Sequence, residues 1–294
     1  MNEGKGLISD DDNPEKNLVI TGVSTGIGRA LAEVFCGRGY RVFGSVRNLK
    51  DSEPLTKVYA DKFFPLVFDV QDDEAIEQAA DLVAEQLAGR RLEGLINNAG
   101  IAIGGPLEHQ PLEEIRRHFE INVMGVLKTT RAFLPMLGTD SSYIGSPGRI
   151  VNVSSVSGKL ADPFVGAYAG SKHALEAMSA SWRQELKVYG IKLILIGPGA
   201  VRTPIWDKGI DASKYTGTSY ESALRKAATF AVKNGQEGWE PAYLARKIYR
   251  VFTKRRPGRR YAFVANKTVK WTLRRALPVS LVEKITGRVL RLGR

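Results

Sequence analysis

The hydrophobic and polar positions of this 294-residue chain follow two alternating patterns. Short continuous apolar runs, such as LVI at 18–20 and LILI at 193–196, are typical of strands that are buried on both faces. We expect strands at 18–21, 41–46, 63–68, 92–96, 149–153 and 192–196, and helices at 27–37, 72–87, 112–137 and 166–189. This alternation predicts an α/β fold, a Rossmann-type doubly wound parallel sheet flanked by helices in a single domain.

The same pattern indicates where the domain begins and ends. Residues 1–16 are polar and rich in Asp, which predicts a disordered lead-in. The dinucleotide-binding and catalytic domain is expected to span 17–265, and a helix at 241–254 and a strand at 260–265 close it. Inside it the segment 205–238 loses the regular pattern, and 266–294 follows as a basic amphipathic tail.

The net charge of +12 lies almost entirely near the end of the chain. From Lys254 to Arg294 there are 13 Lys and Arg and one acid, Glu283, so the preceding part is neutral. The single cysteine, Cys36, excludes an internal disulfide, and the three histidines stand at no metal-ligand spacing, so no metal is expected. Because the chain has no secretory signal and no apolar run of about 18 residues, we expect a cytoplasmic protein.

A glycine-rich segment, TGVSTGIG at 21–28, follows the first predicted strand and opens the first helix. Glycines at 22, 26 and 28 leave no Cβ where a backbone must approach a pyrophosphate, and the helix N-terminus offers free N–H groups. The alternative is an ordinary tight turn. The interpretation as a dinucleotide loop assigns cofactor binding to Gly22, Ser24, Gly26, Ile27 and Gly28.

The end of the second predicted strand favours NADP(H) over NAD(H). Proteins that prefer NAD usually carry an acid there for the ribose 2′-hydroxyl, but this chain has Val46 followed by Arg47. A guanidinium is suited to a 2′-phosphate through charge-assisted hydrogen bonds. An ordinary surface arginine is the alternative.

Two further strand ends carry polar side chains. Asp69 ends the third strand, where it could cap the next helix or bind an adenine amino group. Asn97 and Asn98 end the fourth, where asparagines can tie neighbouring strands together. For each of these residues, structural and functional roles remain open at this point.

Tyr168 and Lys172 lie four residues apart on a predicted helix and therefore share one face. A phenol with a pKa near 10 is a poor base, but a nearby ammonium stabilises the phenolate. Proton exchange with an alcohol then becomes feasible. Such a pair on its own is usually only exposed, but this one follows the fifth strand and Ser154-Ser155.

With these motifs in order, the chain resembles the short-chain dehydrogenase/reductase family. The resemblance covers 17–204 and rests on TGVSTGIG at 21–28, NNAG at 97–100, Asn122, NVSS at 152–155, YAGSK at 168–172 and PGAVRTP at 198–204. Weaker similarity at 254–263 points to retinol and 17β-hydroxysteroid dehydrogenase-like members.

The resemblance implies a role for each matched residue. Tyr168 would be the acid/base, Lys172 would hold the nicotinamide ribose, and Ser155 would bind the substrate oxygen. Asn122 would hold a water of the proton relay. The resemblance also places these residues near the cofactor: Asp69, Asn98, Val201 and Thr203. Family members often form dimers or tetramers through the helices expected here at 112–137 and 166–189.

The expected function is hydride transfer between NADP(H) and an alcohol or carbonyl compound. Aromatic residues in 205–238, which matches the substrate lid of the family, either contact a bulky lipophilic substrate such as a steroid or retinoid or only pack the lid; they are Trp206, Tyr215, Tyr220 and Phe230. The rival hypothesis from another class is a regulatory NADP(H)-binding protein without turnover. The complete set of matched catalytic residues argues against it.

The tail beyond residue 265 exceeds the minimal fold. Its apolar positions fall on one helical face and are Leu281, Val282, Ile285, Val289 and Leu292, flanked by Lys284, Arg288 and Arg291. A basic amphipathic helix is typical of proteins peripheral to a membrane surface. The alternative is packing on the protein's own body or on a neighbouring subunit, and nucleic acid is not expected as a partner.

Overall fold

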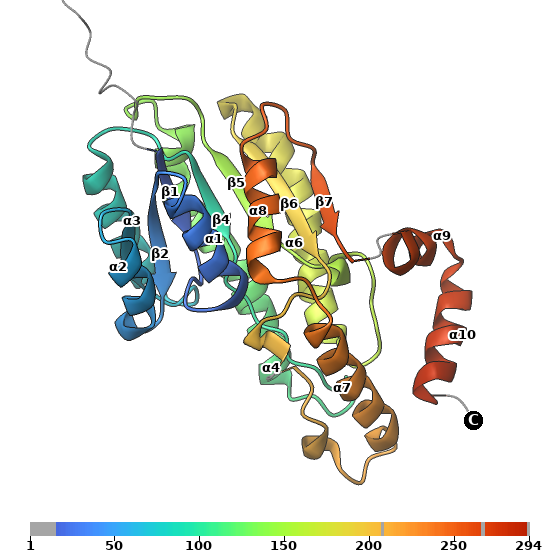
Figure 1. Ribbon diagram of the computed structural model, residues 1–294. Helices are drawn as coiled ribbons and strands as arrows, with labels where there is room; N and C mark the ends of the chain where they lie inside the picture. The colour runs from blue at the N-terminus through green and yellow to red at the C-terminus, as the bar shows by residue number, and fades with distance from the viewer. Residues whose placement is uncertain (1–15, 207–208, 266–267, 293–294) are drawn as a thin grey trace, which may run out of the picture.

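The computed structural model describes residues 16–206, 209–265 and 268–292 and shows one seven-stranded parallel sheet (Figure 1). The strand order is β3-β2-β1-β4-β5-β6-β7. The strands are β1 (Lys16–Ile20), β2 (Tyr40–Val46), β3 (Phe63–Val67), β4 (Gly94–Asn97), β5 (Arg149–Val153), β6 (Lys192–Pro198) and β7 (Arg260–Phe263). The predicted doubly wound α/β fold is therefore confirmed. The lead-in predicted for 1–16 lies outside the described residues except for Lys16, which opens β1.

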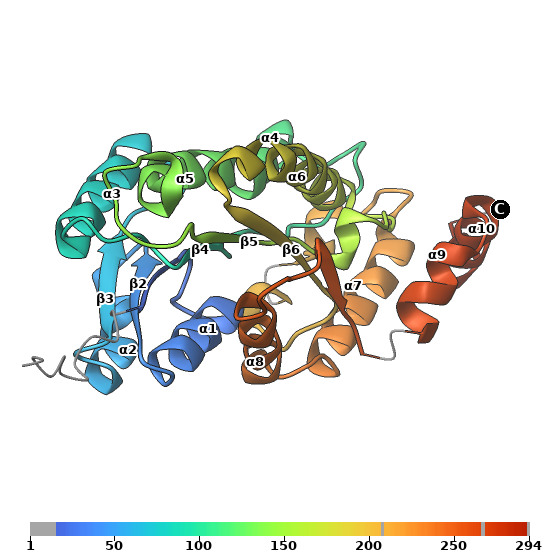
Figure 2. The ribbon, with the colours of Figure 1, turned by 90° about the horizontal axis from the view of Figure 1, so that it is seen from above.

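Helices cover both faces of the sheet. One face carries α3 (Asp73–Leu87), α4 (Leu112–Phe119), α5 (Gly125–Leu134) and α6 (Gly166–Glu185), and the other carries α1 (Gly26–Cys36), α2 (Glu53–Val58) and α8 (Pro241–Phe252) (Figure 2). Each face has its own apolar core, and the strand residues Leu18, Val42 and Ile96 belong to the one under α1 and α8. Because all strands run in parallel, their carboxyl ends lie along one edge of the sheet. The chain continues from β1 to β2 and β3 and from β4 to β5, β6 and β7, so the connections after these two neighbouring strands lead to opposite halves of the sheet.

Three helical segments differ from the sequence-based expectation. The long helix expected over 112–137 is interrupted by a π-helical turn at Glu120–Met124, because one extra residue enters the turn around Asn122. A short helix, α2, lies where none was expected. Half of the segment that lacks a regular apolar pattern forms α7 (Glu221–Gln236), which packs through Ala223 and Leu224.

The tail is helical and leaves the body after β7. It contains α9 (Arg274–Ala276) and α10 (Val279–Leu290). Leu290 is buried in a small cluster with Phe164, Tyr215 and Leu224, so α10 packs on α7. The other side of α10 is exposed at Leu281, Ile285 and Val289, and Leu292, which follows the helix, is exposed as well. The single apolar face expected from the sequence is thus divided, since Val282 lies with the partly buried positions.

Candidate active site

The glycine-rich loop between β1 and α1 is shaped by three glycines. Gly22 and Gly26 have φ angles of +70° and +59°, a backbone conformation that residues with a side chain rarely adopt. At Gly28, in the first turn of α1, a Cβ would lie 2.1 Å from the carbonyl oxygen of Gly22. The N-cap residue Thr25 forms no capping bond through its side chain, so the N–H groups at this helix end keep their binding capacity. The loop therefore fits a pyrophosphate.

The side chain of Asn98 is hydrogen-bonded to the backbone of this loop. Its Nδ2 donates to the carbonyl oxygens of Thr21 and Gly22, both at 3.0 Å. The Thr21 hydroxyl in turn accepts from the backbone N–H groups of Asn98 and Ala99, at 2.9 and 3.0 Å. The structure thus gives Asn98 a bracing role beside the cofactor loop, and it adds Thr21, which the sequence analysis did not single out.

The neighbouring Asn97 is structural. Its Nδ2 donates to Thr130 Oγ1 at 2.8 Å and to Asn152 Oδ1 at 2.9 Å. Asn152 continues to Ser179 Oγ at 2.9 Å. This buried chain of side chains joins α5, β4, β5 and α6, so the interpretation of Asn97 as a tie between strands is confirmed.

The other predicted cofactor residues line the same carboxyl edge. Arg47 is exposed directly after β2, whereas Val46 is buried. Asp69 accepts hydrogen bonds from the backbone and the side chain of Gln71, at 3.0 and 3.2 Å, so it also shapes its own turn. Thr203 lies against the glycine loop, since a Cβ on Gly26 would approach its methyl group to 3.0 Å.

The remaining three predicted contacts are half-buried or buried. Ser24 and Ile27 are half-buried in the loop and its helix, and Ile27 packs on the core beneath α1. Val201 is buried and pairs with Trp239 in an isolated bridge. Ser24 and Ile27 therefore belong to the loop that Gly22, Gly26 and Gly28 form, whereas Val201 belongs to the core beneath α1.

The catalytic candidates converge beside this loop. Tyr168 and Lys172 lie one turn apart near the start of α6, and Ser155 follows β5. The Ser155 side chain lies close enough to Tyr168 to lower the pKa of its hydroxyl. Lys172 is buried, its Nζ donates to the carbonyl oxygen of Val153 at 3.0 Å, and it lies 5.9 Å from the centroid of the Tyr168 ring.

Burial governs the protonation of both groups. It raises the pKa of the Tyr168 hydroxyl, and the Ser155 side chain opposes the rise. It lowers the pKa of Lys172 to about 8, and the carboxylate of Glu176 opposes that change. The sequence argument expected the ammonium to lower the pKa of the phenol, but burial raises that pKa here. At neutral pH the phenol is therefore protonated and able to donate.

Asn122 is buried in the π-helical turn, and both the oxygen and the nitrogen of its side-chain amide form hydrogen bonds. Its Oδ1 accepts from the Ile101 N–H at 2.9 Å, and its Nδ2 donates to the Ile101 carbonyl oxygen and to Ser171 Oγ, both at 3.0 Å. Gly100 lies between Asn122 and Lys172, since a Cβ there would be 2.9 Å from Asn122 Oδ1 and 3.6 Å from Lys172 Nζ. All four predicted catalytic residues thus gather in one place.

His118 also belongs to this site, although the sequence analysis gave it no role. It is fully buried, its Nε2 accepts from the Ile103 N–H at 3.0 Å, and its Nδ1 lies 2.7 Å from the Glu114 carbonyl oxygen. Its ring lies edge-on to Tyr168, with the centroids 6.4 Å apart. Burial lowers the pKa of His118, so it packs as a neutral ring beside the phenol.

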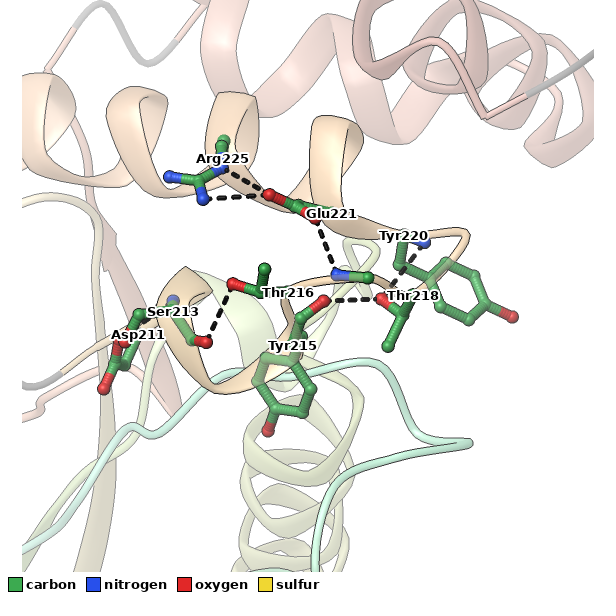
Figure 3. Close-up of polar contacts among 9 residues, drawn as sticks. Asp211, Ser213, Tyr215, Thr216, Thr218, Tyr220, Glu221 and Arg225 are labelled. Carbon is green, nitrogen blue, oxygen red and sulfur yellow. Dashed lines mark hydrogen bonds and ion pairs between the residues drawn. The ribbon is translucent and has the colours of Figure 1, made fainter.

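The segment 205–238, predicted to be a substrate lid, packs most of its aromatic residues inward. Trp206 donates from Nε1 to the Val201 carbonyl oxygen at 2.7 Å, and Tyr215 is buried. The Tyr220 hydroxyl donates to Glu108 at 2.8 Å, whereas Phe230 is exposed. Figure 3 shows the turn before α7, in which Glu221 accepts from the backbone N–H of Gly217 at 2.7 Å and from Arg225. Three of the four aromatic residues therefore make contacts within the protein, and only Phe230 of the four points to solvent.

Residues 16–213 match the family model described as short chain dehydrogenase. The chain belongs to the short-chain dehydrogenase family. It is accordingly an oxidoreductase, and its named relatives are reductases and dehydrogenases. The expected family is thus confirmed, including the similarity to retinol dehydrogenases.

Three relatives show how far the similarity extends. An NADPH-dependent 3-dehydrocapnine reductase from Ornithobacterium rhinotracheale is 34% identical over 91% of this chain and 94% of its own length. A 3-ketodihydrosphingosine reductase from Bacteroides thetaiotaomicron is 31% identical over 82% of this chain and 84% of its own. Retinol dehydrogenase 16 from Mus musculus is 35% identical over 65% of this chain and 58% of its own.

The solved structures agree with the fold. A short-chain dehydrogenase from Streptomyces avermitilis superimposes with a TM-score of 0.77 and 28% identity, covering 95% of this chain and 98% of its own. Within the described part of this chain, no helix combines the length and apolar character needed to cross a bilayer.

Proposed function

We propose that the protein transfers a hydride between NADP(H) and an alcohol or carbonyl compound, with Tyr168 as the general acid/base. The observation that carries this proposal is the placement of Tyr168 one helical turn from the buried Lys172, with Ser155 acting on the Tyr168 hydroxyl and the glycine loop alongside. NADP(H) supplies or accepts the hydride when it is bound. The regulatory alternative would predict a broken set of catalytic side chains, and this set is complete.

The protein's own residues manage the proton. In reduction, Ser155 and Tyr168 donate hydrogen bonds to the substrate carbonyl oxygen, which polarises the carbonyl bond. Tyr168 then gives its proton to the developing alkoxide, and the raised pKa of the phenol keeps that proton available at neutral pH. The ammonium of Lys172 stabilises the phenolate that is left. Oxidation uses the same groups in reverse.

Arg47 is proposed to select NADP(H) by binding the 2′-phosphate. Arg47→Glu is expected to weaken NADPH binding about 10- to 100-fold, because a charge-assisted hydrogen bond of about 1.5–3 kcal/mol becomes a repulsion. The Michaelis constants for NADPH and NADH measure this. Lys50→Glu, at an exposed position nearby, is the matched control. An unchanged ratio of the two constants in Arg47→Glu would refute the assignment.

The proposed substrate is a lipophilic ketone or its alcohol. Two relatives that match over most of this chain are named as a 3-dehydrocapnine reductase and a 3-ketodihydrosphingosine reductase, and two others are named as retinol dehydrogenases. A screen with 3-ketodihydrosphingosine, retinal and steroid ketones, followed by NADPH absorbance, tests the class. Tyr168→Phe provides the background rate for each compound.

A homo-oligomer is proposed on the exposed apolar side chains of the helices that family members use for pairing. Phe119, Met124 and Met178 are 39%, 41% and 38% exposed on α4, the π-helical turn and α6. Apolar side chains gathered at such sites are typical of subunit contacts. Light scattering of the full chain measures the mass.

The outer face of α10 is proposed to contact an anionic membrane surface. Leu281, Ile285 and Val289 are exposed along it, and Lys284 and Arg288 lie beside them. Lys284→Glu/Arg288→Glu is expected to reduce flotation of the full chain with phosphatidylserine vesicles, by about fivefold for each charge removed. Arg255→Glu/Arg256→Glu, in the loop before β7, is the control of equal charge. Equal flotation of both variants would contradict a role of the tail.

A further inference from the structure

Glu176 is a buried carboxylate one turn beyond Lys172 on α6. It is 2% exposed, and its two oxygens are both 2.9 Å from Arg260 Nε. Arg260 Nη2 approaches it to 2.8 Å, and the Ser154 hydroxyl donates to it at 3.1 Å. Lys159 Nζ lies 3.2 Å away. A buried charge is tolerated only when it is paired and hydrogen-bonded, and here each of these groups around the Glu176 carboxylate is a hydrogen-bond donor.

Arg260 connects this carboxylate to the catalytic serine. It belongs to β7, at the edge of the sheet, and its Nη2 also donates to the backbone carbonyl oxygen of Ser155 at 3.2 Å. Its guanidinium stacks over Trp271 of the tail at 4.9 Å. One arginine therefore holds the backbone of Ser155, the predicted partner of Tyr168, from a position 105 residues further along the chain.

Two glycines leave the space that this pair needs. A Cβ on Gly197 in β6 would lie 2.5 Å from Arg260 Nη2. A Cβ on Gly158 would lie 2.7 Å from Ser154 Oγ and 2.8 Å from Glu176 Oε1. Larger residues at either position would displace the guanidinium or the carboxylate, so the local backbone is built around the pair.

The pair also affects the charge on Lys172. The carboxylate of Glu176 favours the ammonium and so opposes the fall in the pKa of Lys172 that burial causes. The other charged or titratable side chains around this lysine come from four elements. They are Tyr168 on α6, His118 on α4, Arg260 on β7 and Lys159 in the loop after β5, the last two acting through Glu176.

We propose that Glu176 and Arg260 are positioning residues for hydride transfer, which place Ser155 against Tyr168 and keep Lys172 charged. This inference rests on the proposed function. Neither side chain touches the reacting atoms, so both act through Ser155 and Lys172. A purely structural role, joining β7 to the sheet, would change stability without changing the charge of Lys172.

The test uses Glu176→Gln, Arg260→Lys and the paired variant Glu176→Met/Arg260→Met in the full chain. The paired variant removes both members of the buried Glu176–Arg260 ion pair together, so neither is left as a buried charge without the other, and it is expected to fold. Its turnover is expected to fall about 10- to 100-fold with little change in NADPH affinity, because a small misplacement of Ser155 is costly in the transition state. Arg260→Lys is expected to recover part of that loss.

The control is Arg149→Met. Arg149 opens β5 at the amino-terminal end of the strand, where it binds the carbonyl oxygens of Phe252 and Lys254, so its loss tests packing without touching Ser155. Turnover in Arg149→Met is expected to stay within about twofold of the wild type. A folded paired variant with wild-type turnover would overturn the positioning role.

The charge on Lys172 is measured without relying on activity. In the cofactor-free protein labelled with ¹³C at lysine Cε, the Lys172 signal, assigned from Lys172→Met, reports its titration. Glu176→Gln removes a negative neighbour and is expected to lower the midpoint by about one pH unit. The alkaline limb of turnover is expected to move down with it. An unchanged titration midpoint of Lys172 in Glu176→Gln would overturn the proposed effect of Glu176 on the charge of Lys172. If the wild-type protein reduced none of the carbonyl compounds tested, only the proposed function would be refuted.

Discussion

Replacing Tyr168 with phenylalanine is expected to lower turnover about a thousandfold, within the range of about 10²–10⁴ typical of a lost general acid. The phenol's proton is the one that the alkoxide needs, and its raised pKa keeps that proton in place at neutral pH. Ser155 would keep its hydrogen bond to the substrate oxygen but has no acidic proton of suitable strength. Steady-state NADPH oxidation with an active ketone measures the loss.

A measurement of NADPH binding distinguishes the loss of the general acid from a loss of folding. Because Tyr168→Phe removes only the hydroxyl and retains the ring that packs near His118, the Kd for NADPH, measured by fluorescence titration, is expected to change by less than about threefold. Tyr249→Phe, in α8 on the other face of the sheet, is the matched control and should retain full turnover. Near-normal activity of the Tyr168 variant would remove the basis of the proposed mechanism.

The features that the sequence analysis predicted well are local. The glycine loop lies within eight residues, and Tyr168 and Lys172 are one helical turn apart, so their geometry follows from a strand, a turn and a helix. The strand order could also be expected, because alternating strands and helices wind in a restricted way. Such patterns need no knowledge of distant contacts.

The features that were missed depend on residues far apart in the sequence. Glu176 and Arg260 are 84 positions apart, and nothing in either neighbourhood indicates that they meet. The π-helical turn at Asn122 was also not predicted, because a single extra residue leaves the apolar pattern of the helix almost unchanged. Its cause is the bonding of Asn122 to the Ile101 backbone, which is a tertiary contact.

The pKa argument shows the same limit in energetic terms. From spacing alone, an ammonium near a phenol lowers its pKa. The sequence does not state how deeply the two groups are buried, and in the fold desolvation dominates at both Tyr168 and Lys172. The direction of the tyrosine's shift therefore reversed once burial was known.

Gly28→Ala is expected to have the second large effect, through the cofactor loop. The φ of Gly28 is not in the left-handed region, so the space around it decides the outcome. An alanine Cβ would lie 2.1 Å from the Gly22 carbonyl oxygen and 2.4 Å from Asn98 Nδ2, and the first of these is backbone that cannot turn aside. The glycine loop and the Asn98 side chain must move apart, which is expected to lower the free energy of unfolding by about 1–3 kcal/mol.

Because the displaced segment is the one that fits the pyrophosphate, the Kd for NADPH is expected to rise at least about tenfold. Fluorescence titration measures that Kd, and thermal unfolding measures the stability. Gly287→Ala in α10 is the control, since no atom lies within 4 Å of its added Cβ and alanine favours a helix. If Gly28→Ala bound NADPH as tightly as this control, the loop would not be the pyrophosphate site, and the cofactor would have to lie elsewhere along the carboxyl edge.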